Sequence, residues 1–402
     1  MHDRVRPWTV LAEKNFALLW SSLLISGIGS QLTSVAIAWQ VYEITDSPLQ
    51  LGLTGLFRAA PLIGFALTGG WLADRVERRR LLIATQTLAL FMSLSLALLT
   101  QSGAIRVWEI YVILFAQSAL MSFDLPTRDA LIPNLVPAEH LASAFALTVT
   151  LRQAAFLAGP FIGGAVIAWA GTRWCYYLDA ASFLAVIVCL AFMKIRAAAA
   201  RRRETGLRSM LEGFAFIRRN ALIFALLVTD ACVNFFGAYR GLMPIFARDL
   251  LGVGPSGLGA LLGAPALGAL AGSGIVIALG NPRRKARLIV TITLLYTAGL
   301  VAFALSRSFL LSLAIAFTLG ALDAVGETLR MTVVQLMTPD ELRGRVQAVV
   351  FIFVIGGPFL GQAELGLVAS FAGATGALVL GGILASGAVA LMARTIFRAD
   401  EM

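Results

Sequence analysis

The sequence predicts an all-α membrane protein with twelve transmembrane helices arranged as two pseudo-symmetric six-helix bundles. Two observations on composition support this fold class: hydrophobic residues make up 59% of the 402 residues, and charged residues only 13%. A soluble chain carries about 25% charged residues, because its surface must face water. A third observation is that long apolar runs recur along the whole chain, so most of its surface must face lipid or other apolar segments.

The apolar runs set the expected helices. A bilayer core about 30 Å thick needs roughly 20 apolar residues in a helix, and a barrel would instead show alternating apolar and polar residues. Twelve runs meet the helical requirement, at 16–42, 50–73, 81–100, 108–126, 141–170, 174–193, 221–247, 256–280, 287–306, 309–330, 346–370 and 374–396.

The positive charges predict the orientation of these spans. With the N-terminus placed inside, 25 of the 32 Lys and Arg residues fall on inner segments, 4 on outer segments and 3 within spans. Cytoplasmic loops of membrane proteins carry an excess of Lys and Arg. We therefore expect both termini in the cytoplasm, which requires an even number of spans.

The net charge of +10 does not indicate nucleic-acid binding, because the basic residues lie in short segments between apolar runs and not on one soluble face. The three cysteines (Cys175, Cys189 and Cys232) lie in or beside apolar runs, and the only histidines are His2 and His140. These numbers and positions predict neither a disulfide framework nor a metal site. No phosphate-binding G-x-x-x-x-G-K-[ST] motif occurs, so ATP-driven transport would need a separate subunit. The loops also lack a His-rich or paired-carboxylate cluster with metal spacing, and we expect no cofactor and no enzymatic activity.

The longest polar segment divides the chain. We expect an N-terminal bundle over 1–193, a cytoplasmic linker over 194–220 and a C-terminal bundle over 221–402. Within the linker, five apolar residues follow a helical repeat and predict an amphipathic helix along the inner membrane surface. They are Leu207, Met210, Leu211, Phe214 and Ile217.

The two halves repeat each other. Arg128, Pro137 and Glu139 recur at an offset of 202 residues, as Arg330, Pro339 and Glu341. The run Gly159-Pro160-Phe161-Ile162-Gly163 recurs at an offset of 198, as Gly357-Pro358-Phe359-Leu360-Gly361. Parallel repeats of this kind suit a transporter whose halves move around a central site.

The loop after the second span reads Gly70-Trp71-Leu72-Ala73-Asp74-Arg75-Val76-Glu77-Arg78-Arg79. It resembles the G-x-L-A-D-R-x-G-R-R loop of the major facilitator superfamily, with Glu77 where that family usually has Gly, and the resemblance extends over the whole chain. It implies that Asp74 meets the second half near the eleventh span and that Arg75 pairs with Asp124 on the fourth, latching an inner gate. The alternative is a basic loop that only sets topology.

The fifth span carries Gly159, Pro160, Gly163 and Gly164, which resemble the end of the G-P-x-x-G-G motif of antiporter branches. Close helix packing alone would also explain these small residues. The segment 128–137 and its echo at 335–345 are similar to the exporter branch that includes the enterobactin exporter and macrolide-efflux proteins. The R-x-x-Q-G motif of many proton-driven members is absent from the fourth span, so proton coupling is implied by the superfamily alone.

Polar residues inside spans are costly and commonly functional. Asp323 and Glu327 lie four residues apart on one helical face, with Arg330 three further on, so Glu327 and Arg330 could instead form a structural ion pair. We place substrate or proton coupling first at Asp323 and second at Glu327. The full set of candidates for substrate binding or proton coupling is Gln31, Arg58, Arg152, Asp230, Asn234, Asp323 and Glu327.

Together these features predict a monomeric secondary exporter in the bacterial inner membrane, with a small-molecule substrate, protons as the driving ion and the lipid bilayer as its environment. The alternatives are an importer or symporter of the same fold, and a polytopic membrane enzyme or sensor. The acidic residues would suit lipophilic cations, whereas Arg58 and Arg152 would suit anionic siderophores. The sequence leaves that choice open.

Overall fold

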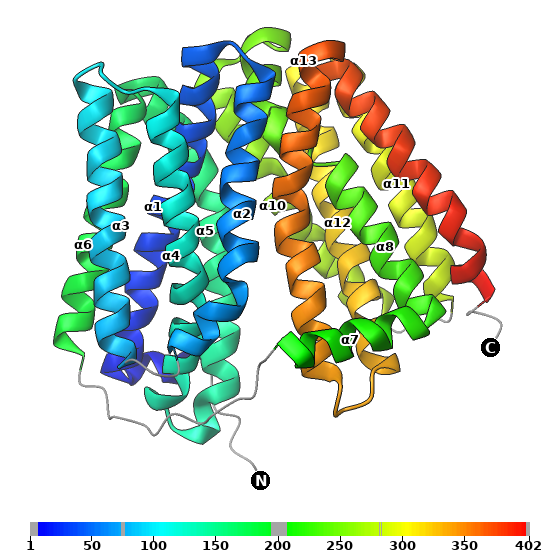
Figure 1. Ribbon diagram of the computed structural model, residues 1–402, viewed down its shortest axis with the longest axis horizontal. Helices are drawn as coiled ribbons and strands as arrows, with labels where there is room; N and C mark the ends of the chain where they lie inside the picture. The colour runs from blue at the N-terminus through cyan, green and yellow to red at the C-terminus, as the bar shows by residue number, and fades with distance from the viewer. Residues whose placement is uncertain (1–6, 74–76, 194–206, 281, 283, 399–402) are drawn as a thin grey trace. The chain divides into compact units, whose positions relative to one another are not determined.

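A computed structural model describes residues 7–73, 77–193, 207–280, 282 and 284–398 (Figure 1). The described residues form helices joined by short turns, and no strand occurs among them. Many large apolar side chains remain exposed on this protein, including Trp169, Ile277 and Phe371. Exposed apolar surface on this scale requires a membrane or a partner. The prediction of an all-α membrane protein is confirmed.

The chain separates into two compact units. Unit 1 contains residues 1–40 and 60–204, and unit 2 contains residues 41–59 and 205–402. The boundary between the units therefore crosses the first two long helices, so the C-terminal end of the first and the N-terminal part of the second belong to unit 2. The division into bundles at 193 and 221 stays a prediction.

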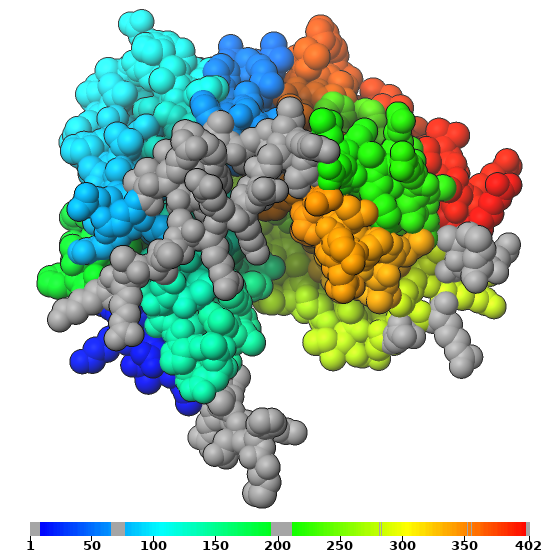
Figure 2. Space-filling view, turned by 60° about the horizontal axis from the view of Figure 1, so that its bottom comes forward, coloured from blue at the N-terminus to red at the C-terminus, as the bar shows by residue number. Residues whose placement is uncertain are grey.

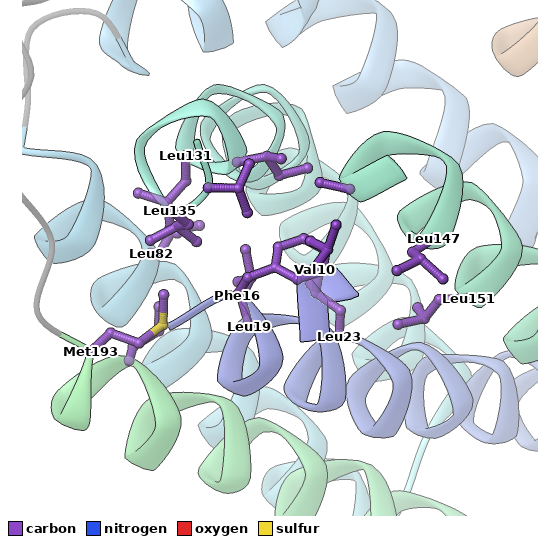
Figure 3. Close-up of a cluster of buried hydrophobic side chains, with 14 of the residues drawn as sticks. Val10, Phe16, Leu19, Leu23, Leu82, Leu131, Leu135, Leu147, Leu151 and Met193 are labelled. Atoms are coloured by element: carbon purple, nitrogen blue, oxygen red, sulfur yellow. The ribbon is translucent and has the colours of Figure 1, made fainter. Parts of the chain in front are cut away.

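Unit 1 is built from parts of the first two helices and four further long helices. These are α1 (Lys14–Thr45), α2 (Pro48–Ala73), α3 (Arg78–Gln101), α4 (Val107–Leu131), α5 (Leu141–Ala170) and α6 (Thr172–Phe192), with short 3-10 turns η1 (Pro7–Ala12), η2 (Ile132–Asn134) and η3 (Ala138–His140). Figure 3 shows its buried cluster, in which Phe16 and Leu19 of α1 meet Leu82 of α3 and Leu131 of α4. Burying such side chains contributes about 1.5–3 kcal/mol each where the alternative is water.

Unit 2 contains the remaining helices. They are α7 (Leu207–Arg219), α8 (Ala221–Phe236), η4 (Tyr239–Leu242), α9 (Met243–Ile245), η5 (Phe246–Leu250), α10 (Gly254–Leu279), α11 (Lys285–Leu305), α12 (Phe309–Met337) and α13 (Arg343–Arg398). Its core lies between α8, α11, α12 and the second arm of α13. A smaller cluster joins α7 to α12 and to the start of α13.

Ten of the described helical segments are long and apolar enough to cross a membrane. One of them is α13, whose 56 residues would extend about 84 Å as a straight helix. Its chain turns back at Gly373, where φ is +71°, a value that glycine adopts without a steric penalty. Figure 1 shows the two resulting arms in orange and red. With the second arm of α13 and with α2, the predicted count of twelve spans is reached.

The seventh apolar run, expected as one segment over 221–247, is broken. The helix α8 ends at Phe236, and the chain continues through η4, α9 and η5 as far as Leu250. Gly237 follows α8, and a Cβ atom there would lie 2.5 Å from the carbonyl oxygen of Val233. The apolar run predicts one helix, although Gly237, Arg240 and Gly241 interrupt its apolar residues directly after Phe236.

The segment in which an amphipathic helix is predicted forms the helix α7, and its place along the membrane surface stays a prediction. Gly213 and Ile217 are buried, and a Cβ atom on Gly213 would lie 2.5 Å from the carbonyl oxygen of Arg345 at the start of α13. Glu212 also forms an ion pair with Arg345. The opposite side of α7, which forms part of the green surface in Figure 2, exposes Leu211 and Phe214.

Glycines and an ionic cluster attach residues 41–59 to the rest of unit 2. The helices α2 and α13 touch through their backbones, because a Cβ atom on Gly52 would lie 2.7 Å from the Cα atom of Gly366. At the end of α1, the Arg248 guanidinium pairs with Asp46 and lies 5.0 Å from the centre of the Tyr42 ring. The Tyr42 hydroxyl donates to Asp249. These contacts explain why this segment belongs to unit 2.

Candidate membrane charge cluster

Unit 2 contains a buried ion pair between two of its long helices. Asp230 lies on α8 and Arg330 on α12, with 2.5 Å between the Asp230 Oδ1 atom and the Arg330 Nη2 atom. The exposed fractions of the two side chains are 9% and 12%. A charge buried in an apolar environment needs such a partner, because desolvation of an isolated charge is very costly.

The repeat explains why Arg330 reaches across to another helix. Arg128, its counterpart in unit 1, pairs with Asp124 on its own helix at 2.5 Å. The position equivalent to Asp124, 202 residues later, is occupied by Gly326. A Cβ atom on Gly326 would lie only 3.3 Å from Nη1 of Arg330. The missing side chain thus removes the local partner and leaves space for the guanidinium that pairs with Asp230.

Asp323 and Glu327 complete this group on α12. The Glu327 carboxylate interacts electrostatically with Asp230, Asp323 and Arg330. Asp323 interacts in the same way with Asp230 and with Arg240 of η4. We call these five residues the charge cluster. It combines three carboxylates with two guanidinium groups, so with every group ionised one negative charge remains unbalanced.

The predicted alternative for Glu327 and Arg330 is wrong as stated. Among the described residues, the ion pair of Arg330 is with Asp230, and Glu327 forms none. Glu327 and Arg330 instead line a small pocket beside Asp230, which is closed by apolar side chains of α8, α12 and α13. Asn234 lies one turn after Asp230, but its side-chain Nδ2 donates to the main-chain oxygen of Asp230 at 3.0 Å.

The gating loop is described only in part. Gly70 lies near the end of α2, whereas Asp74 and Arg75 lie outside the described residues, so the latch stays a prediction. The carboxylate of Asp124, the partner expected for Arg75, pairs with Arg128 and accepts hydrogen bonds from Thr85 and Gln86 at 3.1 and 2.7 Å.

Two other arginines of that loop bind helix ends. Arg78 donates to the carbonyl oxygen of Ala130 near the end of α4 at 2.9 Å. Arg79 donates to the carbonyl oxygens of Leu190 and Ala191 near the end of α6, at 2.8 and 2.7 Å. Helix C-termini have unpaired carbonyl groups and favour cations. These two residues therefore hold the start of α3 against the ends of α4 and α6.

The antiporter-like motif packs α5 against α1. A Cβ atom on Gly159 would lie 2.3 Å from the Cβ atom of Gln31, and one on Gly163 would lie 3.3 Å from the Cα atom of Leu32. Pro160 and Gly164 are buried beside them. Close packing accounts for these small residues, and the same contacts fix the position of Gln31 along α5.

The remaining candidates, Arg58 and Arg152, lie outside the charge cluster. In unit 2, the Arg58 guanidinium carbon lies 5.9 Å from the centre of the Phe359 ring. In unit 1, Arg152 is half-exposed and lies 3.7 Å from Asp129. Among the described residues, no group of three or more His, Cys, Asp or Glu side chains could hold a metal ion.

Sequence reasoning missed one buried acid, Asp179 on α6. It is 1% exposed and accepts hydrogen bonds from Thr33 and Ser93. The sequence feature that could have identified Asp179 was a single carboxylate in the apolar run 174–193, whose other residues were expected to face lipid or neighbouring helices.

Comparisons with known proteins agree with this fold. Two curated relatives are enterobactin exporters EntS, from Shigella boydii serotype 18 (strain CDC 3083-94 / BS512) and Escherichia coli O139:H28 (strain E24377A / ETEC). Each is 28% identical over 354 residues, which cover 87% of this chain and 84% of the relative.

Solved transporter structures share the architecture at low identity. A bacterial homologue of the human lysosomal transporter Spinster, in an inward-facing and unoccupied conformation, matches with a TM-score of 0.77 at 15% identity, covering 99% of both chains. A bacterial homologue of the iron transporter ferroportin matches with a TM-score of 0.70 at 15% identity, covering 96% of this chain and 99% of the other. At these identities the likeness establishes the fold alone.

The family model described as transmembrane secretion effector matches residues 5–402. This agrees with the two repeated halves, the basic loop after the second span and the exporters among the relatives. The chain belongs to the transmembrane secretion effector family of the major facilitator superfamily and has the fold of its transporters.

Proposed function

We propose that this protein is a proton-driven exporter that moves drug-like or siderophore-like molecules out across the bacterial inner membrane. It acts as a monomer and by alternating access, with both termini in the cytoplasm. Proton coupling is proposed because of the charge cluster, which combines three carboxylates with two guanidinium groups. One carboxylate of the three is therefore free to bind and release a proton without breaking the Asp230–Arg330 pair.

Asp323 is our first choice for the proton-carrying group, and Glu327 is the second. Asp230 is committed to Arg330 at 2.5 Å, whereas Asp323 and Glu327 form no ion pair with any residue that the structure describes. Protonating a carboxylate that has no ion-pair partner costs less free energy, because no salt bridge is broken. The relatives support the direction, because the curated proteins named above are exporters of a siderophore.

The proposed orientation is supported by the distribution of Lys and Arg, 25 on the inner segments against 4 on the outer. In unit 2, the basic helix α7 and the C-terminal end of α13 lie at the same end (Figure 1). This common end agrees with an even number of crossings after the linker.

The test uses purified protein in liposomes, with enterobactin and the lipophilic cation ethidium as probe substrates. Counterflow without a pH gradient measures exchange, and accumulation under an imposed pH gradient measures coupling. Proton antiport predicts that substrate moves opposite to the protons, whereas movement in the same direction would make the protein a symporter.

Asp323→Asn should abolish gradient-driven accumulation and preserve counterflow. Asp340→Asn is the matched control, since the Asp340 side chain is 79% exposed and pairs with Arg343 outside the charge cluster. Full accumulation in the Asp323→Asn protein, at normal expression, would refute this assignment. Attention would then turn to Asp230 or to Glu364, another acid within an apolar run, on the first arm of α13.

A further inference from the structure

Besides Asp124, which pairs with Arg128, unit 1 contains the buried carboxylate of Asp179. Asp179 lies on α6, and its Oδ2 atom accepts two hydrogen bonds, from Thr33 of α1 at 2.8 Å and from Ser93 of α3 at 2.7 Å. Each hydroxyl has a single hydrogen to donate. The three helices therefore meet at one carboxylate oxygen.

The other oxygen, Oδ1, lacks a good donor. The hydroxyl of Ser182 lies 3.5 Å from Oδ1, but that hydroxyl donates at 2.7 Å to the main-chain oxygen of Asp179. The single hydrogen of Ser182 cannot serve both acceptors well at these distances. The Ser182 oxygen thus presents a lone pair towards Oδ1, which is the arrangement that a protonated Oδ1 would satisfy by donating to Ser182.

The absence of a side chain at position 29 makes this arrangement possible. A Cβ atom on Gly29 of α1 would lie 2.8 Å from Oδ1 of Asp179 and 2.5 Å from the Ser182 hydroxyl oxygen. Such distances would force either group to move. Gly29 therefore leaves space on α1 for the carboxyl group and the Ser182 hydroxyl together.

No positive charge among the described residues compensates Asp179. No Lys, Arg or His side chain forms an ion pair with it among the residues that the structure describes. On its own helix the titratable neighbours are Cys175, whose thiol lies within electrostatic range of Asp179, and Tyr176, whose hydroxyl donates to Gln40. On α5, Arg152 pairs with Asp129.

On the other packed elements the charged groups are engaged elsewhere or stand at helix ends. The arginines at the start of α3, which packs along α6, bind helix ends or Glu77. Lys14 is the first residue of α1 and Arg173 the second residue of α6, whereas Asp179 lies in the interior of the unit. An ionised carboxylate without a counter-charge is strongly disfavoured away from water.

From this geometry we infer that Asp179 is a second proton-binding site, which is neutral in the conformation described here and carries its proton on Oδ1. The inference rests on the proposed proton-driven function for its role in transport, but the site itself is defined by the hydrogen bonds. Release breaks the Oδ1–H bond and passes the proton to a water molecule. The Ser182 hydroxyl can then turn from the main-chain oxygen and donate to the new carboxylate.

The hydrogen bonds connect this site to neighbouring helices. Gln117 of α4 donates to Ser93 at 3.4 Å, and Thr33 lies two residues after Gln31 on α1. A shift of α1 would carry Thr33 away and remove one of the two donors that Oδ2 has. Protonation of Asp179 and the position of α1 are thereby linked.

Infrared difference spectroscopy of the full-length protein in lipid films tests the site directly. A protonated carboxyl group has a carbonyl stretching band that shifts in D₂O, and we expect such a band at pH 7 in the wild-type protein. Asp179→Asn should lose it, whereas the control Asp340→Asn should retain it. An unchanged spectrum in Asp179→Asn at pH 7 would overturn the inference.

Two further measurements test whether loss of the band in Asp179→Asn comes from misfolding of the variant. The Asn amide can donate to Ser182 as the neutral acid would, so Asp179→Asn should unfold at the wild-type temperature. Thr33→Val removes a donor that stabilises the ionised form, so the band should persist to higher pH than in the wild type. Loss of the band at lower pH in Thr33→Val would also refute the inference.

Transport measured on the same samples separates the two proposals. If wild-type transport does not depend on an imposed pH gradient but the Asp179 band is present, proton-driven export is refuted and the proton-binding site is retained. Gradient-driven transport without the band would refute the site and leave the proposed function standing.

Discussion

The pair between Asp230 and Arg330 should be among the costliest single contacts to break in unit 2. We consider Asp230→Asn and Arg330→Gln, separately and together. Removing one partner of a buried ion pair costs about 3–5 kcal/mol, because the other charge stays buried without compensation. The exposed fractions of these side chains, 9% and 12%, place the pair in that class.

The surroundings predict that the two single substitutions are unequal. Asp230→Asn leaves Arg330 near Asp323 and Glu327, which replace part of the lost attraction, so its cost should fall near 3 kcal/mol. Arg330→Gln leaves three carboxylates with only the Arg240 guanidinium, and its cost should approach 5 kcal/mol. The double substitution removes both charges and should cost no more than Arg330→Gln alone, which gives a coupling energy of about 3 kcal/mol.

The measurement is the free energy of unfolding of purified protein, by titration of detergent micelles with sodium dodecyl sulfate. The control is the same cycle on Asp340 and Arg343, which lie 2.8 Å apart with side chains 79% and 51% exposed. Exposed pairs contribute about 0.2–1 kcal/mol. A coupling energy for Asp230 and Arg330 no larger than that of the control would refute the assignment of a buried pair.

Three further predictions follow from packing and charge. Gly159→Ala should destabilise the protein by about 1–3 kcal/mol, because its Cβ atom would meet Gln31 at 2.3 Å; Gly387→Ala, with open space around it, should show no loss in the same unfolding assay. A reporter fused after Arg202 should be active on the cytoplasmic side, and periplasmic activity would contradict the topology. If the loop is a latch, Asp74→Asn should make cysteines introduced at positions expected to line the substrate cavity more accessible from the cytoplasm. Unchanged labelling with normal transport would indicate that Asp74 only helps to set the topology.

The sequence was sufficient for the helices, because a bilayer imposes its thickness on every span. Apolar runs of sufficient length predicted the long helices closely, and the helical repeat at 207–217 predicted α7. The motifs also predicted the superfamily, since the loop after the second span combines a fixed order of residues with a fixed place. The break after Phe236 was missed because the whole run 221–247 was treated as one span, although Gly237, Arg240 and Gly241 interrupt it.

Partners within the membrane needed the tertiary structure. Spacing along α12 placed Arg330 within reach of Glu327, yet the guanidinium pairs with Asp230 on α8, because contacts between helices depend on their rotation and axial position. Asp179 was passed over because one carboxylate in an apolar run gives no information on its neighbours. Its three hydroxyl contacts come from residues 33, 93 and 182, which only the packing of α1, α3 and α6 brings together. Periodicity along one helix identifies a face, whereas the partner of that face is set by the packing of the other helices.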